Sequence, residues 1–320
     1  MSQALPFGAP PLGAILAGGN RRHFQHGPID LVIEATGVGH EVGRAYKQAW
    51  ARFETILGEL VGELPALRAP FKASGPKLGG PAIEGAVAQR MEAACARHQG
   101  VFVTPMAAVA GAVADEVLAA LVVGRALEKA YVNNGGDIAL YLSPGASFDA
   151  GMVSLADTPS AAGTIAIDYA SSARGIATSG WRGRSLSLGI ADAVTVLAPN
   201  AAEADVAATL IANAVDTDYP RIERVPAREL DPDSDLGARM ATVNVGVLPD
   251  AAVIAALDAG ADAAKRMIAG GHILAAHLVL QGEVRTIGAA PLKALTDQAE
   301  PNIAATRSTG LDKRRRAWPT

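Results

Sequence analysis

The chain has 320 residues, half of them apolar and 19% charged, so a disordered polypeptide is excluded and one large domain or two packed lobes is expected. Its formal net charge of −4 provides no broad positive field, and nucleic acid is therefore not an expected partner. Cys95 is the single cysteine and cannot form an internal disulfide, which favours a reducing compartment, the cytoplasm.

The chain is expected to contain one domain between two irregular ends. Prolines and glycines interrupt the first twenty residues, so residues 1–25 are predicted to form an N-terminal arm. Residues 26–292 form the domain, bilobal or undivided, and the polar residues 293–320 form a flexible tail. The longest apolar stretch, residues 101–114, falls short of the roughly 20 residues that a membrane helix needs, so no membrane partner is expected.

The first third of the chain is predicted to alternate a strand with helices. Residues 29–35 are short and rich in branched side chains, which is typical of a strand. Residues 41–64 place apolar side chains at helical spacing, which predicts a surface helix. A loop rich in proline and glycine then leads to a second helix at residues 81–97.

A third helix is predicted to begin at Thr104-Pro105, because threonine can cap unpaired N–H groups and proline at the first helical position loses no hydrogen bond. It is expected to run to about residue 129. Its first half is apolar nearly all round, which indicates burial. The partial positive charge at its N-terminus makes that end a candidate anion site.

Strands and two further helices are expected in the rest of the chain. Asn200 and Glu203 have the spacing of a capping box and predict a helix that ends near residue 214. The other expected elements are strands at 131–142 (two, around the turn 133–137), 163–169, 192–198 and 241–248, a helix at 250–265, and a hairpin at 273–287, with a loop at 175–189.

Asp205 and Thr209 form the first candidate site. Their spacing puts a carboxylate and a hydroxyl on one helical face, one turn apart. Such oxygen ligands suit Mg²⁺, which completes its shell with waters and ligand phosphates. The structural alternative is that Asp205 only complements the helix dipole.

The loop that contains Ala177, Thr178, Ser179 and Gly180 forms the second candidate site. Its small residues would let a ligand touch the backbone, and its hydroxyls can bind phosphate. Trp181 could stack on a planar ring, and the guanidinium of Arg184 could donate two hydrogen bonds to a phosphate. The alternative for Trp181 is an ordinary core side chain.

The third candidate site is the turn Asn133, Asn134, Gly135, Gly136 and Asp137, together with the helix start at Thr104. It matches neither a P-loop nor a dinucleotide fingerprint. The six histidines lack metal-ligand spacing, and His26 is either a hydrogen-bonded structural residue or a catalytic one. The acidic run 231–235 lacks the spacing of an EF-hand and is interpreted as a solvated loop.

Taken in order, these segments resemble the ApbE family, flavin transferases that bind FAD with Mg²⁺ and attach FMN to a threonine of a target protein. The resemblance is strongest to cytoplasmic relatives of unknown activity. The matching segments span about 105 residues and are Gly111 with Asp115, Asn133 to Asp137, Ala177 to Gly180, Val194 to Val196, and Ala204 to Thr209.

The resemblance implies a mixed α/β (α+β) fold with buried helices packed against mostly antiparallel sheets. It also implies that Asp205, Thr209 and the carbonyl of Ala108 hold Mg²⁺, and that the other two sites bind FAD or FMN. Ala110 replaces the lysine of the family motif, and its His-x-x-Asp-Pro-x-x-Gly segment is missing between Gly180 and Val194.

Three functions remain open from the sequence. The first is a Mg²⁺-dependent FMN transferase or FAD-cleaving enzyme with an acceptor protein, in which Asp192 or His26 would serve as the base. The second is a flavin carrier or sensor without transfer chemistry. The third is another enzyme of small-cofactor metabolism on the same scaffold, which uses the pocket for another phosphorylated or pterin-like ligand.

Overall fold

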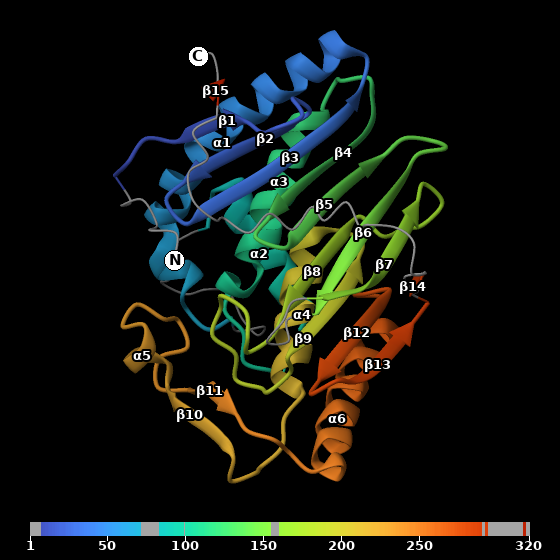
Figure 1. Ribbon diagram of the computed structural model, residues 1–320. Coiled ribbons are helices and arrows are strands. Elements are labelled where there is room, and N and C mark those ends of the chain that lie inside the picture. Colours follow the sequence, from blue (N-terminus) through green and yellow to red (C-terminus); the bar gives the residue numbers. More distant parts are fainter. Residues whose placement is uncertain are drawn as a thin grey trace.

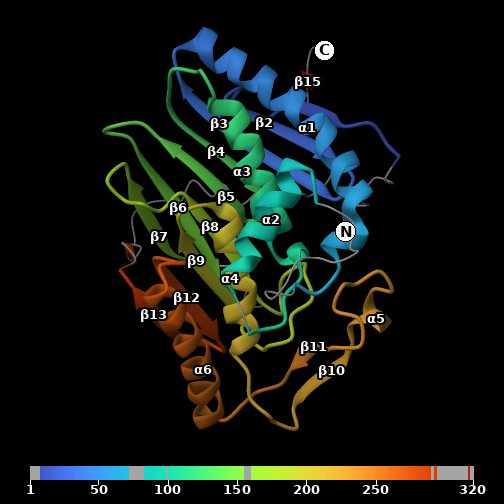
Figure 2. The same ribbon diagram turned by 180° about the vertical axis from the view of Figure 1, so that it is seen from behind.

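The computed structural model describes residues 8–71, 83–98, 100–154 and 160–289, and the backbone of two short strands at 292–293 and 316–317. A large antiparallel sheet runs through the molecule, with the long helices on one of its faces (Figures 1 and 2). A smaller sheet lies over part of the other face. The mixed α and β class with mostly antiparallel sheets, expected from the sequence, is confirmed.

The large sheet contains ten strands in the order β13-β12-β9-β8-β5-β4-β3-β2-β1-β15. All of its pairings are antiparallel. Its strands are β1 (Leu12–Ile15), β2 (Arg21–His26), β3 (Ile29–Gly37), β4 (Leu127–Asn134), β5 (Asp137–Leu142), β8 (Gly175–Ser179), β9 (Ala193–Ala198), β12 (Ala275–Leu280), β13 (Glu283–Gly288) and β15 (Arg316–Ala317).

The helices bury one face of this sheet. They are α1 (Gly39–Leu67), α2 (Ala86–Ala96), the short 3-10 turn η1 (Pro105–Ala108), α3 (Val109–Val122), α4 (Ala201–Ala214), α5 (Ala227–Leu230) and α6 (Asp250–Ala269). β3 alternates buried and half-buried side chains, so Ile33 and Ala35 join the helical core while Glu34 and Thr36 face the other way. α3 is apolar nearly all round because α1, α2, α4 and the sheet surround it.

Two smaller β units complete the fold. β6 (Ser147–Ser154), β7 (Ser160–Asp168) and β14 (Leu292–Lys293) form a three-stranded sheet, whose apolar side chains pack against the face of the large sheet that lacks helices. β10 (Ile222–Pro226) and β11 (Met240–Val245) pair as a ribbon that carries α5 (Figure 1).

Most of the expected elements are present, and several differ from the prediction. The helix predicted to reach residue 129 ends at Val122, because Gly124 follows with a positive φ and the chain turns into β4. The loop expected at 175–189 opens with a strand, β8. The expected N-terminal arm contributes β1 and β2, and the strands β6 and β10 were not predicted. Most of the expected tail, 293–320, lies outside the described residues.

One helical run among the described residues, Pro105–Val122, is long and apolar enough to cross a bilayer by length and composition alone. In the fold this run is η1 and α3, the central pair of the helical layer. Core helices of this kind satisfy the same criteria, so the run is weak evidence for a membrane span.

Candidate functional site

The N-terminal end of α3 meets the carboxylate of Asp205. The backbone N–H of Gly111 donates to Asp205 Oδ2 at 3.0 Å, so the anion expected at this helix start is supplied by the chain itself. Burial nevertheless raises the pKa of Asp205 well above its usual range, and the charge of Asp137 raises it further. Burial, and then the negative charge of Asp205, raise the pKa of the Cys95 thiol to about 12, which favours the protonated thiol.

Asp137 approaches the same place from the β4–β5 hairpin. It is the first residue of β5, and its Oδ1 accepts the backbone N–H of Thr178 in β8 at 3.3 Å. Burial raises the pKa of Asp137 to about 7, while the N–H of Thr178 and the charge of Arg184 act in the opposite direction. Asp137 and Asp205 therefore form an acid pair whose negative charge the surrounding protein does not fully balance.

A third carboxylate holds the start of α4. Asp115 of α3 accepts the N–H groups of Ala201 and Ala202 at 3.0 and 2.9 Å, and Asn200 accepts that of Glu203 at 2.8 Å. The first donors of α4 are thus paired within the protein, and this helix start is not left free for an external anion. Burial raises the pKa of Asp115 to about 6.

The glycine of α3 fixes the distance between α3 and α4. A Cβ on Gly111 would lie 2.2 Å from the carbonyl oxygen of Ala201, so only glycine allows the two backbones to approach this closely. The same contact brings the Gly111 N–H within reach of Asp205. Packing of α3 against α4 and the position of the acid pair therefore depend on one residue.

The asparagines and glycines of the hairpin turn shape the wall beside Asp137. Asn133 accepts the N–H of Gly136 at 2.8 Å, and Asn134 donates to the carbonyl of Ala110 at 3.1 Å, which ties the turn to α3. Gly135 has a φ of +67°, and a Cβ there would overlap the Arg184 guanidinium. An exposed cation is thus held next to the turn that carries Asp137.

The donor set around the acid pair fits a hard divalent cation. Thr209 lies one turn after Asp205 on α4, and both side chains are half-buried, while Ala108 ends η1, which packs on α4. Over the described ranges no group of three or more His, Cys, Asp or Glu side chains could hold a metal. A cation here would therefore rest on Asp205 and Asp137, with hydroxyl, carbonyl and ligand oxygens, as Mg²⁺ accepts.

Several residues of the predicted ligand loop pack against protein instead. Gly180 leaves room for the backbone carbonyl of Asp192, and Ala177 is fully buried in the core. Trp181 is half-buried, its Nε1 donates to Asp192 Oδ1 at 3.1 Å, and the Arg182 guanidinium lies 4.7 Å from its ring. The structural alternative for Trp181 therefore fits this geometry better.

Thr178 and Ser179 both lie at the end of β8, but they differ in their surroundings. Thr178 is exposed and its hydroxyl bonds that of Thr195 at 2.9 Å. Ser179 is half-buried. The role of both hydroxyls as phosphate ligands stays a prediction.

The two candidate bases lie in structural settings. The Asp192 carboxylate accepts from Trp181 Nε1, from Arg182 Nε at 2.8 Å and from the Gln281 N–H at 2.6 Å, which joins the loop after β8 to the β12–β13 turn. These contacts give the carboxylate a structural role, and its role as a base stays a prediction. His26 ends β2 with its ring 6.2 Å from that of Phe53 on α1, and its catalytic role stays a prediction.

Thr104 differs from its predicted role as a helix cap. Its side chain makes no capping hydrogen bond, and its hydroxyl donates instead to Asp235 of the acidic run 231–235. That run, which was expected to be only solvated, therefore docks on the start of η1. Arg239 adds a second contact, its guanidinium lying over the ring of Phe102. The sequence signals neither pairing, because 131 positions separate Thr104 from Asp235.

Comparisons with known proteins match the sequence of the chain to a family. A sequence model described as "AbpE bacteria" matches residues 13–286, most of the chain. A UPF0280 protein of Methanothermobacter thermautotrophicus is 38% identical over 132 residues, 41% of this chain and 49% of that protein. A UPF0280 protein of Methanothrix thermoacetophila is 38% identical over 119 residues, 36% and 48% of the two chains. The match spans about half the length of these relatives.

Proposed function

Since the chain belongs to the family described as "AbpE bacteria", we propose that it is an ApbE-like protein that binds a flavin nucleotide through a divalent cation. The acid pair of Asp137 and Asp205 carries this proposal. Two carboxylates with raised pKa values, beside an arginine and a helix start, form a site that a Mg²⁺ ion would stabilise. The order of the ApbE-like motifs supports the flavin as the ligand.

The residues of the site divide into two sets under this proposal. Asp205, Thr209, the carbonyl of Ala108 and, added from its position, Asp137 hold the cation. Arg184 and the turn at Gly135–Gly136 face the nucleotide phosphates, because a guanidinium pairs well with phosphate oxygens. A bound Mg²⁺ supplies positive charge that bridges phosphates and neutralises a leaving group.

A second candidate function is a carrier or sensor that binds the flavin without transferring it. The observation that favours it is the setting of the two candidate bases: Asp192 accepts from three donors of the fold, and the His26 ring lies near Phe53 of α1. Ala110 also stands where the ApbE motif has a lysine. A different phosphorylated ligand on the same scaffold is the third candidate.

Thermal unfolding of the full chain with FAD or FMN, each with and without Mg²⁺, tests the proposal. A flavin at about a hundred times its Kd is expected to add roughly 2.7 kcal/mol to the free energy of unfolding, and only when Mg²⁺ is present. Asp205→Ala should lose this response and remain folded. Asp262→Asn, on the exposed surface of α6, removes a carboxylate elsewhere and should keep it.

The outcomes separate the three candidates. Flavin-dependent stabilisation together with release of AMP from FAD supports the enzyme. Stabilisation without AMP release supports the carrier or sensor. If neither flavin stabilises the protein at any Mg²⁺ concentration, the flavin proposal is wrong, and an unchanged Mg²⁺ response in Asp205→Ala removes Asp205 from the cation site.

A further inference from the structure

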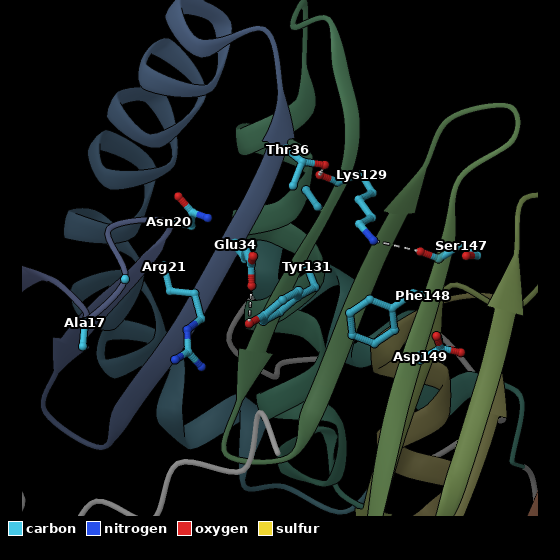
Figure 3. Close-up of a pocket in the computed structure, with 12 residues that line it drawn as sticks. Ala17, Asn20, Arg21, Glu34, Thr36, Lys129, Tyr131, Ser147, Phe148 and Asp149 are labelled. Atoms are coloured by element: carbon cyan, nitrogen blue, oxygen red, sulfur yellow. Dashed lines mark hydrogen bonds between the residues drawn. The ribbon is translucent and has the colours of Figure 1, made fainter. Parts of the chain in front are cut away.

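A groove of about 500 Å³ lies on the face of the large sheet that carries no helices (Figure 3). Strands β3 and β4 form its floor, the β1–β2 turn forms one wall, and β6 forms the other. Its volume is within the range of small-molecule sites in proteins. The groove is separate from the acid pair, because Glu34 and Thr36 of β3 face it while Ile33 and Ala35 face the helices.

Two opposite charges on the facing walls of the groove have no salt-bridge partner among the described residues. Arg21, on the β2 side, has no carboxylate within ion-pair distance in the described part of the chain, and its guanidinium meets the hydroxyl of Tyr131. Asp149, on β6, is exposed and has no cation partner among the described residues. Figure 3 shows these two side chains at opposite sides of the groove.

The space between them has an aromatic surface. The rings of Tyr131 and Phe148 lie 5.4 Å apart and are tilted by 58°. Tyr131 donates to Glu34 Oε2 at 3.1 Å, and Lys129 Nζ donates to the carbonyl of Ser147 at 3.2 Å, so the inner polar groups are already paired. The half-buried ring of Phe148 remains available to an apolar group of a ligand.

We propose that this groove binds a zwitterion of about dipeptide size that carries an aromatic group. Its carboxylate pairs with the Arg21 guanidinium, and its ammonium group pairs with the Asp149 carboxylate. Its ring packs on Phe148 between the two charges. A ligand with a single charge would leave one wall unpaired, which favours a molecule that carries both.

Isothermal titration calorimetry of the full chain with glycylphenylalanine tests the proposal. N-acetylation removes the ammonium charge, amidation removes the carboxylate, and glycylglycine removes the ring. We expect each analogue to bind at least about tenfold more weakly than glycylphenylalanine, because each loses a charge-assisted hydrogen bond or the aromatic contact. The analogues require no change in the protein.

Two variants locate the site. Arg21→Gln should weaken glycylphenylalanine while leaving its amide unaffected, since the amide lacks the group that Arg21 binds. Asp149→Asn should weaken glycylphenylalanine and spare the N-acetyl analogue. Arg44→Gln and Asp262→Asn remove the same charges from the exposed surfaces of α1 and α6 and should leave binding unchanged.

Each remaining outcome overturns the proposal. Absence of heat up to millimolar glycylphenylalanine would exclude this ligand class. Equal affinity of the charged and neutralised analogues would mean that the charged walls do not recognise the ligand. Equal affinity of the wild type and both groove variants would place binding elsewhere. Flavin binding at the acid pair is independent of all three results, because it uses the other face of the sheet.

Discussion

The charge of Asp137 on β5 raises the pKa of Asp205 on α4, although 68 positions of sequence separate the two carboxylates. The hairpin turn delivers one acid and the α3–α4 contact delivers the other. Buried acids that repel each other destabilise a folded chain unless a proton or a cation neutralises them. We therefore expect the stability of the fold to depend on pH and, if a cation binds at the pair as proposed, on divalent cations.

The pH dependence of stability is the first prediction. Burial raises the pKa of Asp137 from 3.8 to about 7, so its native-state proton stabilises the fold at pH 4 and is lost as the pH rises through 7. Asp137→Asn cannot lose that proton. Relative to the wild type, the variant should gain roughly 2–4 kcal/mol of unfolding free energy between pH 4 and pH 8, measured by urea denaturation without divalent cations.

The same experiment with Mg²⁺ provides its control. A cation on the acid pair should stabilise the wild type at pH 8 and should have much less effect on Asp137→Asn. Parallel pH profiles of the two proteins would contradict the raised pKa of Asp137. Equal Mg²⁺ effects would exclude Asp137 from the cation site.

The second prediction concerns the stability of Gly111→Ala. Gly111→Ala places a Cβ 2.2 Å from the carbonyl oxygen of Ala201, a backbone atom that cannot move alone, so α3 and α4 must separate. We expect a loss of roughly 2–3 kcal/mol, despite the better helix propensity of alanine. Gly58→Ala, on the exposed face of α1 with open space around it, should instead gain about 0.5–1 kcal/mol. Equal effects in thermal unfolding would show that the close contact is unimportant.

The regular elements could be predicted because each is determined by a local pattern. Residues 29–35 are short and rich in branched side chains, residues 250–265 are predicted to be a helix, and Asn200 with Glu203 has a local capping spacing; the structure has β3, α6 and α4 there. The end of α3 was misplaced, because the apolar run continues past the positive φ of Gly124. β6 was missed because no clear alternation marks it.

The candidate site was only partly accessible from the sequence, because its contacts are long-range. The turn at Asp137 and the helix position of Asp205 follow from local spacing, but their mutual effect depends on how α4 docks on α3. For Asp192 the sequence gives no indication of its partners. Nothing near this residue in the sequence predicts that Trp181 and Gln281 donate hydrogen bonds to its carboxylate. Local rules therefore identify acids but do not assign their roles.

The third prediction concerns the stability of Asp115→Ala. Asp115→Ala leaves the N–H groups of Ala201 and Ala202 without an acceptor in a buried place, which should cost roughly 2–4 kcal/mol of unfolding free energy. Asp115→Asn keeps one acceptor oxygen and should cost less. Hydrogen exchange of the first turn of α4 provides the measurement, and unchanged protection there in Asp115→Ala would show that the cap is not needed.

The fourth prediction concerns Asp192→Asn, which distinguishes a structural role of this carboxylate from a role as a catalytic base. Its oxygens accept from Trp181, Arg182 and Gln281, so Asp192→Asn replaces an acceptor by an amide N–H that faces donors. We expect a loss of roughly 1–3 kcal/mol of stability, with the Mg²⁺-dependent flavin response retained at temperatures where the variant is folded. If a transfer or FAD-cleaving activity is found, a base would show a lower kcat in Asp192→Asn with unchanged stability. That pattern, measured by steady-state kinetics beside thermal unfolding, would restore Asp192 to a chemical role, because replacing an acceptor oxygen that serves only the structure should lower stability.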